Sequence, residues 1–249
     1  MKERSCRVMK RIIQILLLLT LSFYLAFPLL LSASSTTTSL TTDEKVVYLT
    51  FDDGPTPLVT EQILDVLKEN NIKATFFIVG KEIKGREAIL KRIYDEGHGI
   101  GLHTYSHNFK IIYKNPECFI MEMEKVAATI NETLGVNLDL KVIRFPGGSA
   151  GRLNTKFYDA LCAKGYCIFD WNVDLQDGVK GTMPPSAFVE NAKKCQDHSV
   201  RRIILAHCNG NNKNTALALN DIITYYKNEG YVFKAIDHTT TPYFYRFKK

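Results

Sequence analysis

The chain has 249 residues, of which 45% are hydrophobic and 23% are charged. These fractions are typical of a globular protein and exclude wholesale disorder. The formal net charge is +6, but residues 1–11 alone contain five basic residues and one acidic residue. The remaining chain carries no concentrated basic stripe, which argues against nucleic acid as a partner.

The basic head is followed by an uncharged apolar run over residues 12–31, which is long enough to span a bilayer. Ser32-Ala33-Ser34 offers small residues in a cleavage-like spacing. Residues 1–31 are therefore predicted to be a cleaved signal or an uncleaved membrane anchor, and both alternatives stay open. In either case the positive head stays inside and the domain faces outward, which predicts an extracytoplasmic location. The Ser/Thr-rich residues 32–43 are interpreted as a flexible tether.

Strands and helices are predicted to alternate along residues 44–249, which form one domain. Apolar runs that end at Gly, Pro or polar residues predict strands; they cover residues 46–51, 74–79, 99–102, 141–145, 167–169, 202–206 and 232–236. Helical spacing of apolar residues predicts helices over residues 60–70, 81–96, 118–134, 154–164, 185–195 and 214–228. This alternation indicates an α/β fold with a parallel sheet or barrel, and about seven strand–helix units fit a small or incomplete barrel.

Cysteines indicate neither a disulfide framework nor a redox pair. Of six cysteines, Cys6 lies in the basic head, which leaves an odd number in the domain, and there is no C-x-x-C pair. Most of them are interpreted as small core residues.

Polar side chains recur where the predicted strands end. Two adjacent acids end the first strand, and by themselves they are equally consistent with a surface turn. Histidines and an arginine end three others; the full set is Asp52, Asp53, His103, His107, Arg144 and His207. In a barrel these strand ends converge on one face. The sequence therefore predicts a single site there.

A His-x-x-x-His pair near a carboxylate is a sound three-ligand set for a catalytic divalent metal, because it leaves positions open for water and substrate. The same set serves non-haem iron oxygenases. A second carboxylate beside the ligand favours hydrolysis, since metal-assisted hydrolysis uses a nearby base whereas such oxygenases do not need one. A histidine on another strand can then protonate the leaving group. The residues predict hydrolysis of an amide or ester.

The sequence resembles the NodB-type polysaccharide deacetylases (carbohydrate esterase family 4) over about residues 45–236. The resemblance lies in five motifs: Thr50-Phe51-Asp52-Asp53-Gly54-Pro55, His103-Thr104-Tyr105-Ser106-His107, Arg144-Phe145-Pro146-Gly147-Gly148, Asp174-Leu175-Gln176-Asp177-Gly178 and Ile204-Leu205-Ala206-His207. The first two motifs, in this order, are the specific ones. The resemblance implies a distorted (β/α) barrel and metal-dependent removal of acetyl groups from N-acetylated sugars or acetylated xylan.

The resemblance also implies a role for each matching residue. Asp52 would be the general base, which Arg144 would hold ionised and oriented. The metal ligands would be Asp53, His103 and His107. His207 would be the general acid and Asp177 the carboxylate that orients it, with Asp174 and then Asp170 ranked below it. Backbone N–H groups just after Pro146 would help to stabilise the oxyanion. The metal is predicted to be zinc, with cobalt or manganese as alternatives.

Three positions depart from the family pattern. Gly147 stands where an aromatic or other large residue is usual, Gly178 where the fourth motif usually ends in Trp, and Cys208 where Asp is frequent. Gly147 predicts a more open oxyanion region or pocket wall, and the three departures together leave the substrate less defined. The only tryptophan, Trp171, is not assumed to replace the missing one. His98, His198 and His238 lie off the motifs and are expected at the surface.

The predicted substrate is cell-wall peptidoglycan, with N-acetylglucosamine or N-acetylmuramic residues as targets; this choice depends on the outward location and on family habit. One alternative is the same chemistry on chitin oligomers or xylan. The other is a non-catalytic glycan-binding module on the same fold, against which the intact base, acid and metal set argue.

Overall fold

The computed structural model describes residues 44–179, 182–197 and 199–247. The predicted signal or anchor, residues 1–31, and the tether, residues 32–43, lie outside the described residues, so both segments and the domain boundary stay predictions. Among the described residues, no helix combines the length and the apolar character needed to cross a membrane.

One parallel sheet forms the centre of the described chain. Its strands are β1 (Val46–Gly54), β2 (Thr75–Ile78), β3 (Gly99–Leu102), β4 (Val142–Ile143), β5 (Cys167–Ile168), β6 (Val173–Asp174), β7 (Arg201–His207) and β8 (Val232–Phe233). The strand order is β5-β4-β3-β2-β1-β7-β6, and β8 also pairs with β1. All of these pairings are parallel. In a parallel sheet all strands run in the same direction, so their carboxyl ends lie together at one end of the sheet.

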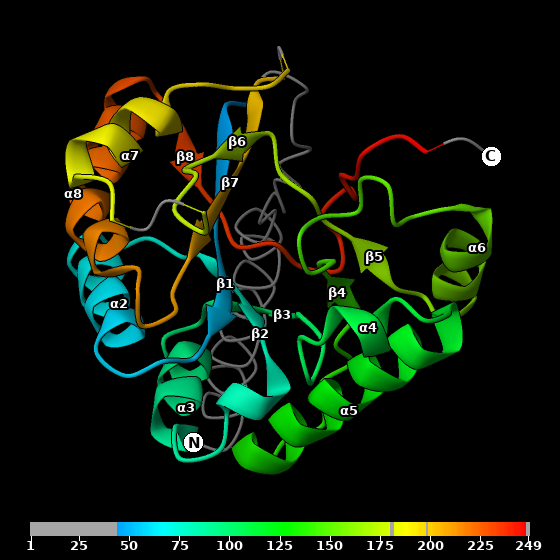
Figure 1. Ribbon diagram of the computed structural model, residues 1–249. Coiled ribbons are helices and arrows are strands. Elements are labelled where there is room, and N and C mark those ends of the chain that lie inside the picture. The colour runs from blue at the N-terminus through cyan, green and yellow to red at the C-terminus, as the bar shows by residue number, and fades with distance from the viewer. Residues whose placement is uncertain (1–43, 180–181, 198, 248–249) are drawn as a thin grey trace, which may run out of the picture. The chain divides into compact units, whose positions relative to one another are not determined.

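The helices lie outside the sheet, as Figure 1 shows. They are α2 (Val59–Glu69), α3 (Glu87–Asp95), α4 (Phe109–Ile112), α5 (Pro116–Leu134), α6 (Thr155–Ala163), α7 (Pro185–Ala192) and α8 (Lys213–Asn228), with a short 3-10 helix η1 (Gly80–Glu82). Asn115 and Asn154 begin α5 and α6, because their side chains accept N–H groups of the first turn at 2.7 and 3.1 Å. Asn154 is the predicted N-cap. Gly135 ends α5 in the left-handed conformation.

Alternation along β1 separates two apolar layers. Val47, Leu49 and Phe51 belong to the larger core that faces the helices, whereas Val46 and Tyr48 belong to the smaller core inside the curled sheet. Neighbouring side chains on a strand point to opposite faces, which explains the alternation. A strand that is buried on both faces is expected to be apolar without interruption, as residues 46–49 are.

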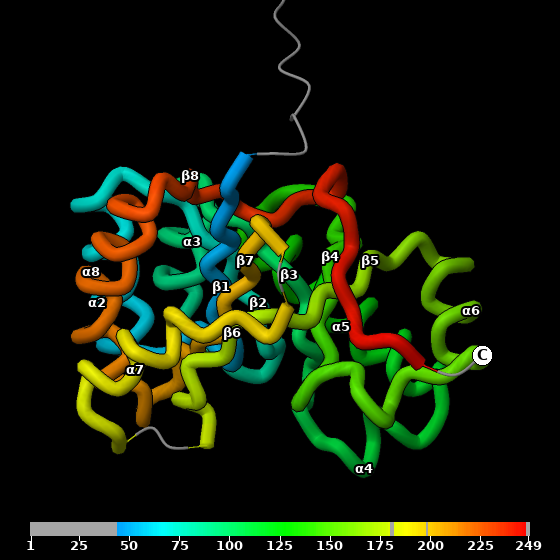
Figure 2. The backbone as a smooth tube through the Cα atoms, turned by 90° about the horizontal axis from the view of Figure 1, so that it is seen from above, coloured from blue at the N-terminus to red at the C-terminus, as the bar shows by residue number. Residues whose placement is uncertain are grey.

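The sheet curls into an incomplete barrel. Strands β5 and β6 lie at opposite edges of the strand order, yet only residues 169–172 join them. Four residues span at most about 14 Å, so the two edges must curl toward each other. Figure 2, which views the chain from above, shows this curl. The predicted distorted (β/α) barrel is confirmed.

Three local predictions differ from the structure. The helix expected over 81–96 is split into η1 and α3, because Gly85 between them has a positive φ of 78°. Strand β6 and helix α4 were not predicted; both are too short to show a periodic pattern. His98 is buried, with 7% of its surface exposed, rather than at the surface. His238 is exposed as expected, and His198 lies outside the described residues.

Candidate active site

A β-bulge places both adjacent acids of β1 at the site. Even-numbered residues of β1 face the barrel interior, so Asp52 points inward and Asp53 would point outward in a regular strand. The pairing of β1 with β2 shifts register between Asp52 and Gly54, and Asp53 has a positive φ of 73°. The extra residue of a bulge re-aims a side chain in this way. The backbone therefore turns at Asp53, one residue before Gly54.

Asp53, His103 and His107 form a cluster able to hold a metal ion. Their ligand atoms all lie within 4.8 Å of one another. The Asp53 carboxylate is 3.6 Å from His103 Nε2 and 3.3 Å from His107 Nε2. Two imidazoles and one carboxylate fit a divalent transition metal and leave further coordination positions open.

The buried His103 is held in the form that a metal ligand requires. Its Nδ1 lies 3.0 Å from the carbonyl oxygen of Arg144, which accepts the Nδ1 hydrogen and leaves the Nε2 lone pair facing the cluster. Burial, opposed by the charge of Asp53, lowers the pKa of His103 to about 3, so the imidazole is neutral. His107, like Asp53, has a positive φ, here 52°. Such strain is characteristic of functional sites.

Asp52 is tied to the fully buried Arg144. One carboxylate oxygen, Oδ1, accepts the Arg144 Nη1 hydrogen at 2.9 Å, and the other, Oδ2, lies 3.6 Å from His103 Nε2. Arg144 Nη1 also donates to the hydroxyl of Thr50 at 2.6 Å. Its guanidinium lies over the ring of Phe77, 4.1 Å from the centroid. Asp52 is thereby fixed with one oxygen facing the metal cluster.

His207 ends β7 directly opposite Asp52, its register partner on β1. Its Nδ1 lies 2.8 Å from Asp177 Oδ1, and its backbone N–H donates to Asp177 Oδ2 at 2.8 Å. Burial opposes the charge on the imidazole. The hydrogen bond and charge of Asp177, with the charges of Asp52 and Asp53, outweigh it and raise the pKa of His207 to about 9. His207 is therefore protonated at neutral pH.

Asp177 is itself anchored by residues that the sequence analysis did not select. Its Oδ2 accepts hydrogen bonds from Thr215 Oγ1 at 2.7 Å and from Asn212 Nδ2 at 3.3 Å. Asp174, ranked second, instead accepts the backbone N–H of Gln176 at 2.7 Å. Nothing in the spacing of residues 212 and 215 marked them as partners of an acid 35 to 38 positions earlier.

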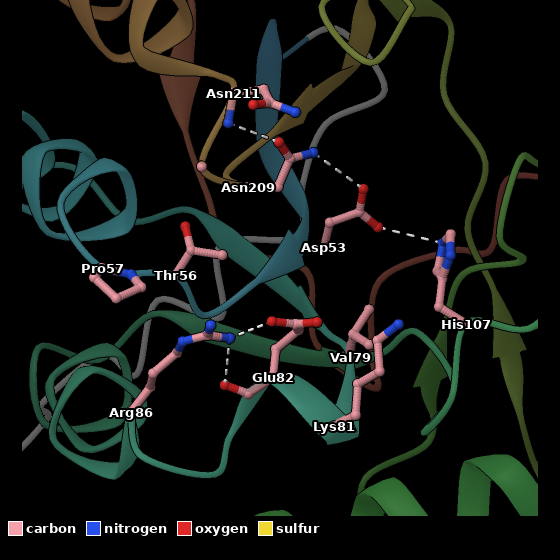
Figure 3. A pocket seen from close by; sticks show the side chains of 11 residues that line it. Asp53, Thr56, Pro57, Val79, Lys81, Glu82, Arg86, His107, Asn209 and Asn211 are labelled. Atoms are coloured by element: carbon pink, nitrogen blue, oxygen red, sulfur yellow. Dashed lines mark hydrogen bonds and ion pairs between the residues drawn. The ribbon is translucent and has the colours of Figure 1, made fainter.

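A pocket of about 420 Å³ opens beside the metal cluster, and Figure 3 shows its lining. Asp53 and His107 form one wall, and Asn209 extends its amide toward Asp53 Oδ2 at 3.4 Å. The opposite wall carries Lys81 and the ion pair between Glu82 and Arg86. Asn209 was not predicted either. The cluster thus faces a polar cavity large enough for a sugar unit.

The two glycines that depart from the family pattern do not leave open space. A Cβ on Gly178 would lie 2.4 Å from His207 Cε1, so the imidazole packs directly against this glycine. A Cβ on Gly147 would lie 3.1 Å from Arg152 Nη2 and 3.3 Å from the ring of Phe109. The expectation of a more open oxyanion region or pocket wall at Gly147 is wrong, because the side chains of Arg152 and Phe109 occupy the space.

Known proteins are similar to this chain in sequence and fold. The family model for polysaccharide deacetylases matches residues 39–166. A peptidoglycan-N-acetylglucosamine deacetylase of Bacillus cereus is 34% identical over 201 residues, 78% of this chain and 70% of the relative. The peptidoglycan-N-acetylmuramic acid deacetylase PdaA of Bacillus subtilis is 32% identical over 201 residues, 79% of this chain and 72% of the relative.

A crystal structure of a polysaccharide deacetylase from Bacillus cereus superposes with a TM-score of 0.73 at 31% identity, covering 81% of this chain and 97% of that one. These similarities confirm the predicted hydrolase and rule out the oxygenase alternative, whose ligand set is the same. The chain belongs to the polysaccharide deacetylase family (carbohydrate esterase family 4) and is an enzyme that acts on carbon–nitrogen (amide) bonds.

Proposed function

We propose that this protein is a metal-dependent hydrolase that removes N-acetyl groups from the amino sugars of cell-wall peptidoglycan. The observation that carries the proposal is the placement of Asp52, with one oxygen held by the buried Arg144 and the other beside the metal cluster. The peptidoglycan substrate is supported by relatives named as deacetylases of N-acetylglucosamine and N-acetylmuramic residues.

Asp53, His103 and His107 would hold the metal, most simply zinc, with cobalt or manganese as alternatives. A divalent ion at this position lowers the pKa of bound water and polarises a carbonyl group. The neutral state of His103 and its hydrogen bond to the Arg144 carbonyl fit this role, because a ligand must offer a free lone pair.

Asp52 then acts as the general base. Its free oxygen takes the proton from the attacking water, while Arg144 keeps the carboxylate oriented by a charge-assisted hydrogen bond. On the neighbouring strand β7, the protonated His207 donates a proton to the departing amine, and Asp177 holds the His207 ring in place. One acid and one base on neighbouring strands thus serve successive proton transfers.

The loop after Arg144 supplies the donor for the developing oxyanion. Of the N–H groups that follow Pro146, that of Gly148 donates to the Phe145 carbonyl, and that of Ser149 donates to Asp170. The N–H of Gly147 has no acceptor among the described residues. A preorganised backbone donor of this kind stabilises the negative oxygen of the transition state. Gly147 is therefore the donor in this proposal.

An extracytoplasmic location follows from the substrate and from the sequence of residues 1–31. Peptidoglycan lies outside the membrane, so an enzyme that acts on it must be exported. Amino-terminal sequencing of the mature protein separates an uncleaved anchor from a cleaved signal.

Acetate release from purified peptidoglycan, chito-oligomers and acetylxylan tests the proposal. The metal-loaded enzyme should act fastest on peptidoglycan, and chelation should abolish activity until zinc, cobalt or manganese is restored. Asp52→Asn should reduce kcat by about 10² to 10⁴-fold without loss of metal, because it removes the base and leaves the ligands. Asp139→Asn, at a carboxylate that is 83% exposed, is the control. Faster release from chito-oligomers or acetylxylan would contradict the choice of substrate, and an active Asp52→Asn enzyme would contradict the mechanism.

A further inference from the structure

Residues 169–171, between β5 and β6, touch two parts of the active site through groups that the proposed mechanism does not use. Arg144 donates from Nε to the Phe169 carbonyl at 2.9 Å and from Nη2 to the Asp170 carbonyl at 3.2 Å. The ring of Trp171 packs against Gly148 in the loop after Arg144: a Cβ on this glycine would lie 2.9 Å from Trp171 Cη2. This short segment therefore contacts both the arginine behind the base and the loop that carries Gly147.

The side chain of Asp170 connects the segment to that loop. It is fully buried, and its carboxylate accepts the N–H of Ser149 at 2.9 Å and also the hydroxyl of Ser149. These bonds fix the loop two residues beyond Gly147. Among the described residues, no lysine, arginine or histidine side chain forms an ion pair with this carboxylate. Within the described part of the chain, the carboxylate of Asp170 therefore accepts hydrogen bonds from backbone N–H and hydroxyl groups only.

The third donor to Asp170 comes from far along the chain. The backbone N–H of Tyr245 donates to Asp170 Oδ2 at 2.9 Å. Residues 243–245 run parallel to residues 168–170: the N–H of Tyr243 donates to the Ile168 carbonyl at 3.2 Å, and the N–H of Asp170 donates to the Tyr243 carbonyl at 2.6 Å. Figure 2 shows this segment, in red, passing along β5 toward α6.

Tyr245 adds two further contacts. Its hydroxyl donates to the Trp171 carbonyl at 3.0 Å, and its ring meets the Trp171 ring edge-on at 5.8 Å. On either side of Tyr245, Phe244 and Phe247 pack against Tyr158 of α6; their ring centroids lie 5.7 and 5.4 Å from the centroid of the Tyr158 ring. The segment is therefore anchored on both sides of Asp170.

We propose that Asp170 is a positioning residue for catalysis: held in place by the segment Tyr243–Tyr245, it fixes the Ser149 end of the loop so that the Gly147 N–H stays aimed at the oxyanion. This inference rests on the proposed function, because it assumes that the Gly147 N–H acts in deacetylation. A donor displaced by about 1 Å is expected to lose about 100-fold in rate, so the constraint has a large catalytic effect.

Two substitutions test it by different routes. Ser149→Ala removes one donor to Asp170 and leaves the backbone unchanged. Asp170→Asn puts an amide NH₂ where one carboxylate oxygen accepts hydrogens, which sets donor against donor. Ser149→Ala should lower kcat by about tenfold and Asp170→Asn by about 100-fold. In both variants KM should stay within twofold of the wild-type value, and bound metal should not change. Thr239→Ala is the matched control, because that hydroxyl also donates to a carboxylate, Asp237 Oδ1 at 2.7 Å, but is exposed and takes no part in the site.

Amide hydrogen exchange over residues 145–149 gives a readout that does not depend on activity. Exchange there should be faster in Asp170→Asn than in the wild type at a pH and temperature where both are folded. Unchanged loop exchange, or wild-type kcat in both variants, would overturn the inference. If the wild-type enzyme releases no acetate from any glycan, the proposed function fails instead, and loop exchange still decides whether Asp170 holds the loop.

Discussion

At the scale of single residues, His103 and His207 are held in opposite protonation states. Burial dominates at His103 and lowers its pKa to about 3, which keeps a metal ligand neutral. At His207 the pairing with Asp177 and the charges of Asp52 and Asp53 outweigh burial. The imidazole of His103 can therefore offer a lone pair to a metal, whereas the imidazolium of His207 can donate a proton.

The raised pKa of His207 predicts the alkaline limit of the reaction. Because the pKa lies at about 9 rather than at the ordinary 6.5, the proton-donating form is present at neutral pH and is lost as the pH rises through about 9. The alkaline limb of kcat should therefore lie near pH 9. Asp177→Asn should move the limb down by about two pH units, since it removes the carboxylate charge that opposes burial and weakens the hydrogen bond to Nδ1.

Asp139→Asn is the matched control, because Asp139 is an exposed carboxylate that pairs with Lys141 and not with His207. The pH dependence of kcat, measured from pH 6 to 10 at saturating substrate, decides the matter. An alkaline limb that Asp177→Asn leaves in place would show that His207 is not the acid.

At the scale of elements, the close approach of the loop after β6 to the end of β7 makes Gly178 necessary. His207 Cε1 and Nε2 lie 2.4 and 2.8 Å from the position of a Cβ there. A side chain at residue 178 would force the imidazole away from Asp177. The tryptophan that the family resemblance leads one to expect at this position would not fit beside His207 as it stands here.

Gly178→Ala should therefore lower kcat by about 100-fold, because the displaced His207 no longer reaches the leaving group. Metal content should not change. Gly135→Ala, at the left-handed end of α5 with nothing near its Cβ, should cost about 1 kcal/mol of stability without loss of kcat. Kinetics and thermal unfolding of the two variants separate displacement of the acid from loss of stability. Wild-type kcat in Gly178→Ala would contradict this account.

The sequence predicted the elements whose signals are local. Buried strands that end in polar residues placed Asp52, His103, Arg144 and His207 at one end of a parallel sheet, and the structure brings them together. Long-range contacts were not predictable. The bulge at Asp53 depends on pairing with β2, 25 residues downstream in register, and the spaces beside Gly147 and Gly178 are filled by Phe109 of α4 and His207 of β7.

Asp170 illustrates the same limit. Its rank below Asp177 and Asp174 reflected its place off the motifs. Its burial and its bonds to Ser149 and Tyr245 arise from segments 21 and 75 positions away, which no local pattern reveals.

At the scale of the whole molecule, the buried His98 makes stability depend on pH. Its Nδ1 accepts the N–H of Ala74 at 3.2 Å, and its ring meets Phe76 edge-on. Burial, reinforced by the charge of Lys73 and that of Arg92 and opposed by Glu96, lowers the pKa of His98 to about 4. Below pH 6.5 the unfolded chain binds a proton at His98 that the folded chain does not, so the folded state loses stability as the pH falls.

The free energy of unfolding should fall by up to about 3 kcal/mol between pH 6.5 and pH 4 because of this residue. His98→Gln, which cannot titrate, should flatten the fall, whereas His238→Gln, at an exposed histidine, should not. Urea unfolding of both variants at several pH values measures the effect. An unchanged slope in His98→Gln would mean that other groups cause the acid sensitivity.

Strand β1 lies in the middle of the sheet, yet β7, which pairs with one edge of β1, is synthesised much later. The hydroxyl of Thr50 bonds the carbonyl of Ile204, 154 positions along the chain. A chain emerging from the ribosome therefore carries an apolar strand with an open edge for on the order of ten seconds. Such distant pairing also slows folding. Base and acid meet only after β7 has been synthesised and has paired with β1, so a chain that leaves the cell unfolded would have no assembled active site.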